Sequence, residues 1–446
     1  MQQLLFGSAD QIPGRPTGGW GVLHESPDLA PDTAGRLVRL ATVEMAPTVP
    51  QFPSQQDLAG RPVRFRLDFV RGEYAVCRSV EAGTDHTGRP GNVVSHCARI
   101  APVDGVRPVD WFFSPGWLAP FGPRAIADAV LPAELAHAGG WDATAAWLRE
   151  HDSTRMSRLR WIADVGLELL LQGQRLVLKA PTAAEAARWA SVLTWLLDAQ
   201  VASLVKLRIG EDARSIGEQI GLAPVIVGLT GDADPAALRG VPVLDTTWEL
   251  DALAAERVGA WTLPSGQSFP ARPATAIASD LAYALADVAR AVFDKRDELV
   301  NRFRAADGDL QALHEGLFLQ VAWLSTPGAQ DIAREDPIRQ LLAAFDDEVG
   351  AWPELVALAA EVGEQPLPPA PADPYGEPDP AEPPAVDPVR EAVLAAVLLT
   401  RAGVEVEELL ASGTLLANLE GHSDQHQAAL RAIARVLPPP SEGVIH

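Results

Sequence analysis

The stretch from Ser79 to Ile100 constrains the fold most, because two alternating segments flank a short loop rich in glycine and polar residues. In the second segment, side chains at every other position share a face, so His96 points the same way as Val94 and Ala98. The intervening loop has the glycines, aspartate and proline that a long hairpin turn needs. The stretch therefore predicts an antiparallel hairpin centred near Thr87, with His96 pointing inward.

The segments around this hairpin indicate a mainly β domain. Residues 63–70, VRFRLDFV, place apolar side chains on one face and Arg64, Arg66 and Asp68 on the other, a pattern typical of a half-buried strand. Residues 109–114 are predicted to form a further strand. They begin an aromatic segment that suggests a packed lid or a domain seam. We expect a mainly β N-terminal recognition domain over residues 1–125.

From about Pro123 the pattern changes to helices that alternate with short strands. Thr182 and Glu185 have the spacing of a capping box, which predicts the start of a helix over residues 183–198. The turn after residues 224–229 lacks both GxxxxGK[ST] and GxGxxG, so we expect no nucleotide site there. The pattern predicts an α/β middle domain over residues 126–262, with strands at 175–180, 204–209, 224–229 and 242–245.

The C-terminal part of the sequence divides into three segments. Residues 274–363 have the alanine and leucine spacing of a helical region. Residues 364–388 contain ten prolines among alanine and acidic residues, which predicts an extended acidic linker without a core. Residues 389–446 predict a small helical C-terminal segment. The fold class expected for the whole chain is therefore a multidomain α+β or α/β protein.

Charge and cysteine content limit the cellular setting and the partners. A formal charge of −23 argues against nucleic acid and anionic membranes as partners, because phosphate contacts need clustered Lys and Arg. The sequence shows neither a signal peptide nor a membrane span, so we expect a cytoplasmic protein. Cys77 and Cys97 would lie opposite each other in the hairpin. A disulfide is then geometrically possible, although two buried thiols suit a reducing cytoplasm better.

The hairpin loop and its flanks hold the candidate site residues. Arg89 is the best candidate for gripping a carboxylate or phosphate, because a guanidinium binds either with two parallel hydrogen bonds. Its alternative role is an ordinary solvated or salt-bridged arginine. No cofactor is expected, and no metal either, since CxxC and HxxxH spacings are missing around the cysteines.

The same stretch leaves a catalytic and a purely structural alternative open. Asp85, His86 and His96 could perform acid-base chemistry in a hydrolase or transferase, with a nearby hydroxyl as nucleophile. Against this, Asp85 also suits the turn itself, and a histidine on an apolar face is more often a hydrogen-bonded core residue. A recognition hairpin explains the pattern better than an active site does.

Four motifs in this region suggest a family: FGSAD at 6–10, GWGVLHES at 19–26, the pattern AGTDHTGRPGN..SH at 82–96 and FSPGW at 113–117. Together they resemble the N-terminal domain, second type, of bacterial GTPase-associated protein 1. Residues 188–209 are similar to the middle domain of that family. The resemblance implies a non-catalytic adaptor in an actinobacterial or related multi-gene system for biological conflict or immunity. Its partners would be a separate GTPase chain and other components of the same system. The matching motif implies that the shared site of the domain, which would bind a ligand or partner, lies at Asp85, Gly88, Arg89, Gly91, Asn92 and His96.

Overall fold

The computed structural model describes most of residues 1–305 and a few residues between 318 and 326. Within the first range it leaves out residues 86, 151, 213–214, 217–221, 223, 231–240 and 272–276. The chain divides into two units, residues 1–269 and residues 270–446. The first unit holds the candidate site.

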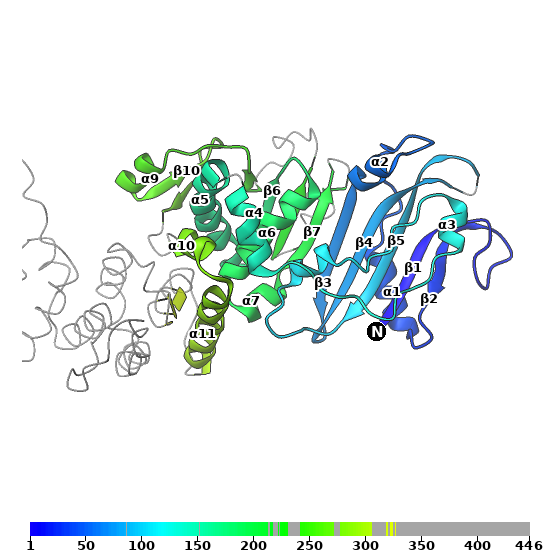
Figure 1. Cartoon of the computed structure of the whole chain (residues 1–446), viewed down its shortest axis with the longest axis horizontal. Coiled ribbons are helices and arrows are strands. Elements are labelled where there is room, and N and C mark those ends of the chain that lie inside the picture. The colour runs from blue at the N-terminus through cyan, green and yellow to red at the C-terminus, as the bar shows by residue number, and fades with distance from the viewer. Residues whose placement is uncertain are drawn as a thin grey trace, which may run out of the picture. The chain divides into compact units, whose positions relative to one another are not determined.

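A nine-stranded mixed sheet forms the centre of the first unit, in the order β2-β1-β5-β4-β3-β7-β8-β6-β9 (Figure 1). Its antiparallel half contains β1 (Gln2–Ala9), β2 (Gly19–Glu25), β3 (Val63–Val70), β4 (Glu73–Thr84) and β5 (Pro90–Ile100). β3 then pairs antiparallel with β7 (Lys206–Glu211). From β7 on, the strands are parallel: β8 (Val225–Leu229), β6 (Arg175–Lys179) and β9 (Val243–Asp245). The predicted mainly β N-terminal region is confirmed, and it shares one sheet with the parallel strands.

The hairpin predicted around Thr87 is confirmed by the pairing of β4 with β5. Cys77 pairs with Cys97 across the two strands, and both cysteines are buried free thiols. His96 is fully buried, as its position beside Val94 predicts. Alternation in the sequence therefore predicted the pairing of Cys77 with Cys97 and the inward direction of His96 correctly.

Both faces of the antiparallel half are covered. On one face α1 (Pro31–Leu40) packs Leu37 and Leu40 against Leu4 of β1. On the other face, the segment that contains α3 (Pro123–Ala127) buries Ile126. The prediction that residues 63–70 form a half-buried strand was therefore wrong at Arg64, which is only 5% exposed.

The strand predicted at residues 109–114 was also wrong, because this segment forms a 3₁₀ helix, η1 (Pro108–Phe113). Proline suits the first turn of a helix, where no N–H is required. The Asp110 carboxylate accepts the Arg107 backbone N–H at 2.9 Å and so closes that turn. Trp111 and Phe112 are nevertheless buried, as an aromatic packing segment predicts.

Helices accompany the parallel half of the sheet. α6 (Ala183–Leu196) packs on β7 and β8, and α5 (Asp152–Leu171) contacts β6. The Thr182 hydroxyl accepts the Glu185 N–H at 3.1 Å, so the Thr182 half of the predicted capping box is present. The remaining elements of this unit are α2 (Gln55–Gly60), α4 (Gly140–Glu150), α7 (Ala199–Leu204), α9 (Ala252–Val258), β10 (Ala260–Thr262) and β11 (Ser268–Pro270).

The second unit is described in part. It contains α10 (Ile277–Tyr283) and α11 (Ala286–Ala305), both within the region predicted to be helical. The predicted linker at 364–388 and the predicted helical segment at 389–446 lie outside the described residues. Across the described parts of the chain, every helix is too short or too polar to traverse a lipid bilayer.

Candidate functional site

The loop between β4 and β5 is held in shape by the Asp85 side chain. One oxygen, Oδ1, accepts the Thr87 N–H and the Thr87 hydroxyl, both at 2.7 Å, and the Arg89 N–H at 2.9 Å. The Asp85 N–H donates to the Arg89 carbonyl at 2.7 Å. Gly88 and Gly91 supply positive φ angles of 84° and 88°, which L side chains rarely adopt. Asp85 therefore organises the turn. His86 lies outside the described residues.

The other two polar side chains of the loop differ in exposure. The Arg89 guanidinium is exposed, and among the described residues it has no hydrogen-bond or ion-pair partner. Asn92 is buried, and its Nδ2 donates to the Thr84 carbonyl at 3.3 Å. Its Oδ1 is buried and has no hydrogen-bond partner within the described ranges. Asn92 therefore belongs to the base of the hairpin, whereas Arg89 is presented to solvent.

His96 is a core residue with both ring nitrogens in hydrogen bonds. Nδ1 accepts the Leu118 backbone N–H at 3.1 Å, so the ring proton must be on Nε2, which donates to Gln3 Oε1 at 3.0 Å. The Trp117 ring packs edge-on against the imidazole, with the ring centroids 5.1 Å apart. Burial, and secondly the charge of Arg78, lower the pKa of His96 to about 4. His96 is therefore neutral at pH 7 and has no ring nitrogen left for a substrate.

The structure does not bring Asp85 and His96 together. His96 pairs with Arg78 on β4, and Asp85 lies seven positions beyond Arg78 in the sequence. At about 3.3 Å per residue, roughly 20 Å separates the carboxylate from the imidazole. The acid-base alternative requires these groups in one pocket within hydrogen-bond reach.

A second set of polar residues, which we call the paired face, lies on β3 and β7 and was not singled out from the sequence. Arg66 Nε and Nη2 donate to Glu211 Oε1 and Oε2 at 2.7 and 3.1 Å. Arg64 pairs with Asp212, and Arg208 Nη2 lies 2.6 Å from an oxygen of the Asp68 carboxylate. These ion pairs join the antiparallel and parallel halves of the sheet. Alternating charges in residues 63–70 and 206–211 were the available signal.

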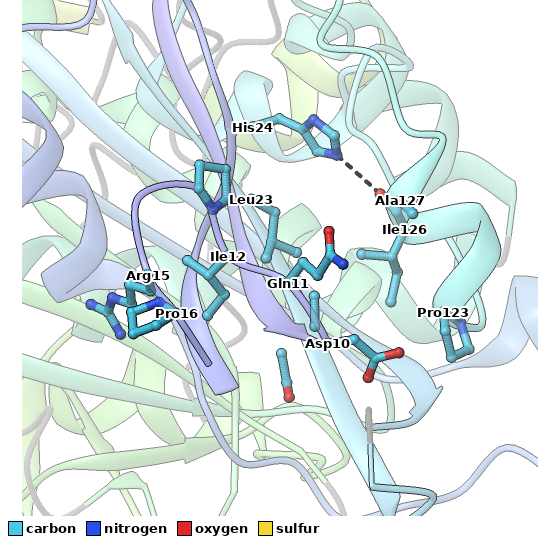
Figure 2. A pocket seen from close by; sticks show the side chains of 13 residues that line it. Asp10, Gln11, Ile12, Arg15, Pro16, Leu23, His24, Pro123, Ile126 and Ala127 are labelled. Carbon is cyan, nitrogen blue, oxygen red and sulfur yellow. Dashed lines mark hydrogen bonds between the residues drawn. The ribbon is translucent and has the colours of Figure 1, made fainter. Parts of the chain in front are cut away.

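A cleft of about 780 Å³ opens at the β2 end of the sheet, between the loop after β1, β2 itself and α3 (Figure 2). Its walls include Asp10 from the FGSAD motif and His24 from the GWGVLHES motif. His24 Nε2 lies 3.1 Å from the Ile126 carbonyl oxygen, which ties β2 to α3. In this view Asp10 lies toward Pro123, whereas Arg15 points away from it.

The chemistry of this cleft suits binding. Ile12, Leu23 and Ile126 supply apolar contact, and Asp10 and Gln11 supply polar groups at the rim. Pockets of this size and mixed lining accommodate a small molecule or a side chain of a partner protein. In the sequence, both motifs indicate only the family resemblance, and neither Asp10 nor His24 is expected to be a site residue. Within the described ranges, no group of three or more His, Cys, Asp or Glu side chains is placed to hold a metal ion.

Comparison with known proteins gives two similar relatives, from two strains of Mycolicibacterium smegmatis. Both carry the name "Putative ESX-1 scaffolding and assembly protein SaeB" and are 29% identical to this chain. Each alignment covers 55% of this chain but 31% of the relative, so this chain spans about a third of the length of its curated relatives. No solved structure matches the chain.

A family model matches the region that contains the hairpin and the cleft. The similarity of residues 188–209 to a middle domain stays a prediction. For the N-terminal region the resemblance is confirmed: residues 1–144 match GTPase-associated protein 1, N-terminal domain type 2.

Proposed function

We propose that this chain is a non-catalytic adaptor in a bacterial GTPase-centred conflict (defence) or signalling system. The domain match at residues 1–144 supports association with a GTPase, and the printed name of the relatives supports a role in scaffolding or assembly. The observation that carries the proposal is the state of His96. Its ring nitrogens both bond within the fold, so the best general base of the motif region is used for structure.

The partner-binding surface in this proposal is the hairpin loop. Arg89 is exposed at its tip, and Gly88 and Gly91 let the backbone take the shape that presents it. A guanidinium recognises a partner carboxylate with two parallel hydrogen bonds, so this loop suits an acidic patch on another protein. The partners are a separate GTPase chain and other components of the same system.

The hydrolase or transferase alternative rests on Asp85, His86 and His96. It is less well supported, because Asp85 holds the loop and lies far from His96. A reaction at either residue alone would lack the paired acid and base that this alternative assumes.

Co-expression of the full chain with the GTPase encoded beside it, followed by size-exclusion chromatography, tests the proposal. We expect co-elution. We expect Arg89→Ala to weaken the complex about tenfold with an unchanged melting temperature, because the substitution keeps the backbone hydrogen bonds to Asp85 and removes a side chain that has no partner among the described residues. Arg39→Ala is the matched control, since Arg39 is an exposed arginine at the end of α1. Separate elution of the two wild-type chains with both GDP and a GTP analogue would contradict the proposal.

A further inference from the structure

Arg78 lies in the middle of the sheet, on the face opposite the paired face. Strand pairing places it directly between Phe65 on β3 and His96 on β5, and directly paired residues point to the same side of a sheet. The Trp117 ring packs edge-on against both neighbours, with centroid distances of 6.2 Å to Phe65 and 5.1 Å to His96. The aliphatic stem of Arg78 is therefore flanked by aromatic rings. We call Phe65, Arg78, His96 and Trp117 the aromatic face.

The guanidinium at the end of this stem has no counter-charge. Among the described residues Arg78 has no hydrogen-bond or ion-pair partner, and its Nε is buried without one. The side chain is half-buried, so its remaining nitrogens reach solvent. Burial, and secondly the like charge of Arg61, lower the pKa of Arg78 to about 10. Arg78 thus keeps its charge at pH 7 in a setting that disfavours it.

Arg61 adds a second positive charge to this place and is itself fixed by backbone groups. Its Nη1 donates to the Glu81 carbonyl at 2.9 Å, and its Nη2 donates to the Ala119 carbonyl. The Glu81 carboxylate attracts Arg61, but its oxygens already accept hydrogen bonds from Thr48 and Val49. Arg61 and Arg78 carry two positive charges, and the Glu81 carboxylate, which already accepts other hydrogen bonds, supplies one negative charge. The net charge of these three groups is therefore positive.

We propose that Arg78, assisted by Arg61, binds an oxyanion: a carboxylate or phosphate group of a ligand or partner. A partly buried guanidinium without a counter-ion is costly, and a carboxylate or phosphate is the group whose oxygens match its planar fork. The other arginines on these strands show the contrast, because Arg64 and Arg66 already lie against carboxylates. This site is separate from the exposed loop at Arg89, and its test needs no protein partner.

The test compares melting temperatures of the full chain in a chloride buffer, with inorganic phosphate or acetate added at constant ionic strength. At ten times the dissociation constant we expect the wild type to gain about 3 °C. Arg78→Met keeps the length of the stem and removes the charge. Its melting temperature should rise with added anion by no more than the general salt effect. Arg39→Met should gain as much as the wild type. A rise with phosphate alone indicates a phosphate ligand, and a rise with acetate indicates a carboxylate. An equal rise in Arg78→Met and the wild type, or no rise in the wild type with either anion, would overturn the proposal.

The stability of Arg78→Met without added anion gives a second readout. Because the substitution removes an unpaired, partly buried charge, its melting temperature should equal or exceed that of the wild type. A clear decrease would mean that Arg78 stabilises the fold by itself, against the proposal. If Arg78→Met does not fold, Arg78→Lys serves instead. It retains the charge but not the fork, so calorimetric titration should show weaker binding of the anion that the wild type binds; unchanged affinity would contradict the assignment.

Discussion

The two faces of strands β3 and β4 differ in whether their arginines are paired with carboxylates. On the paired face, Arg64 and Arg66 meet carboxylates that arrive on β7 and directly after it. On the aromatic face, Arg78 has no carboxylate partner among the described residues, and burial, with the charge of Arg78 as a second cause, keeps His96 neutral by lowering its pKa. On one side of the sheet, arginines are thus paired with carboxylates of the same chain, whereas on the other side Arg78 has no counter-ion among the described residues.

This difference separates structural polar residues from candidates for binding. A buried ion that finds its counter-ion within the fold contributes to a unique arrangement of strands and has nothing left to offer a ligand. A side chain that has no partner among the described residues, such as Arg78 or the exposed Arg89, can still bind a ligand or a partner protein. Residue type alone does not distinguish the two cases, since arginine occurs in both.

The largest effect is expected from breaking the paired face at Glu211, which is fully buried. Glu211→Ala leaves Arg66 without its bidentate partner, and removal of one partner from a buried ion pair costs about 3–5 kcal/mol. Urea denaturation measures the free energy of unfolding. The matched control is Glu249→Ala, because the Glu249 carboxylate is exposed where it pairs with the partly buried Arg158 at 3.6 Å. Equal losses in the two variants would show that the paired face contributes no special stability.

A pH-dependent effect of intermediate size is expected on the aromatic face. The pKa of His96 is lowered to about 4 in the folded state, against an unfolded value of about 6.5. Between these two pH values the unfolded state binds more protons than the folded state. The contribution of His96 to the free energy of unfolding, about 3 kcal/mol, is therefore fully present above pH 6.5 and is lost as the pH falls to 4. Urea denaturation at several pH values should show a shallower loss for His96→Gln, which does not titrate. Parallel curves for the two proteins would refute this account of His96.

The smallest effect is expected at the hairpin loop, outside both faces. Asp85→Ala removes the acceptor of three local hydrogen bonds, but the loop is partly exposed and water can replace some of them. We expect a loss of about 1 kcal/mol and faster hydrogen exchange of the Thr87 and Arg89 amides. Asp85→Asn retains an acceptor oxygen, so its stability and its amide exchange rates should lie between those of the wild type and of Asp85→Ala. Slow exchange in Asp85→Ala would mean that the strands alone shape the loop.

Much of the antiparallel half could be predicted from the sequence because its signals are local. Period-two alternation gave the pairing of Cys77 with Cys97 and the inward direction of His96. The motifs also predicted the family of residues 1–144. The strand expected at 109–114 failed because a proline and an aspartate cap stabilised a 3₁₀ turn in an aromatic segment that periodicity alone assigned to a strand.

By itself, the sequence determined which residues alternate, where the chain turns, and which side of β5 carries its histidine. Only the tertiary structure decided how charges are matched. Arg66 and Glu211 are 145 positions apart, and no local pattern reports that β3 and β7 become neighbours in one sheet. In the part of the chain that the structure describes, the same long-range packing leaves Arg78 near the charge of Arg61 and without a carboxylate partner. Periodicity is a property of adjacent residues, whereas the solvation and pairing of a charge depend on every segment that packs around it.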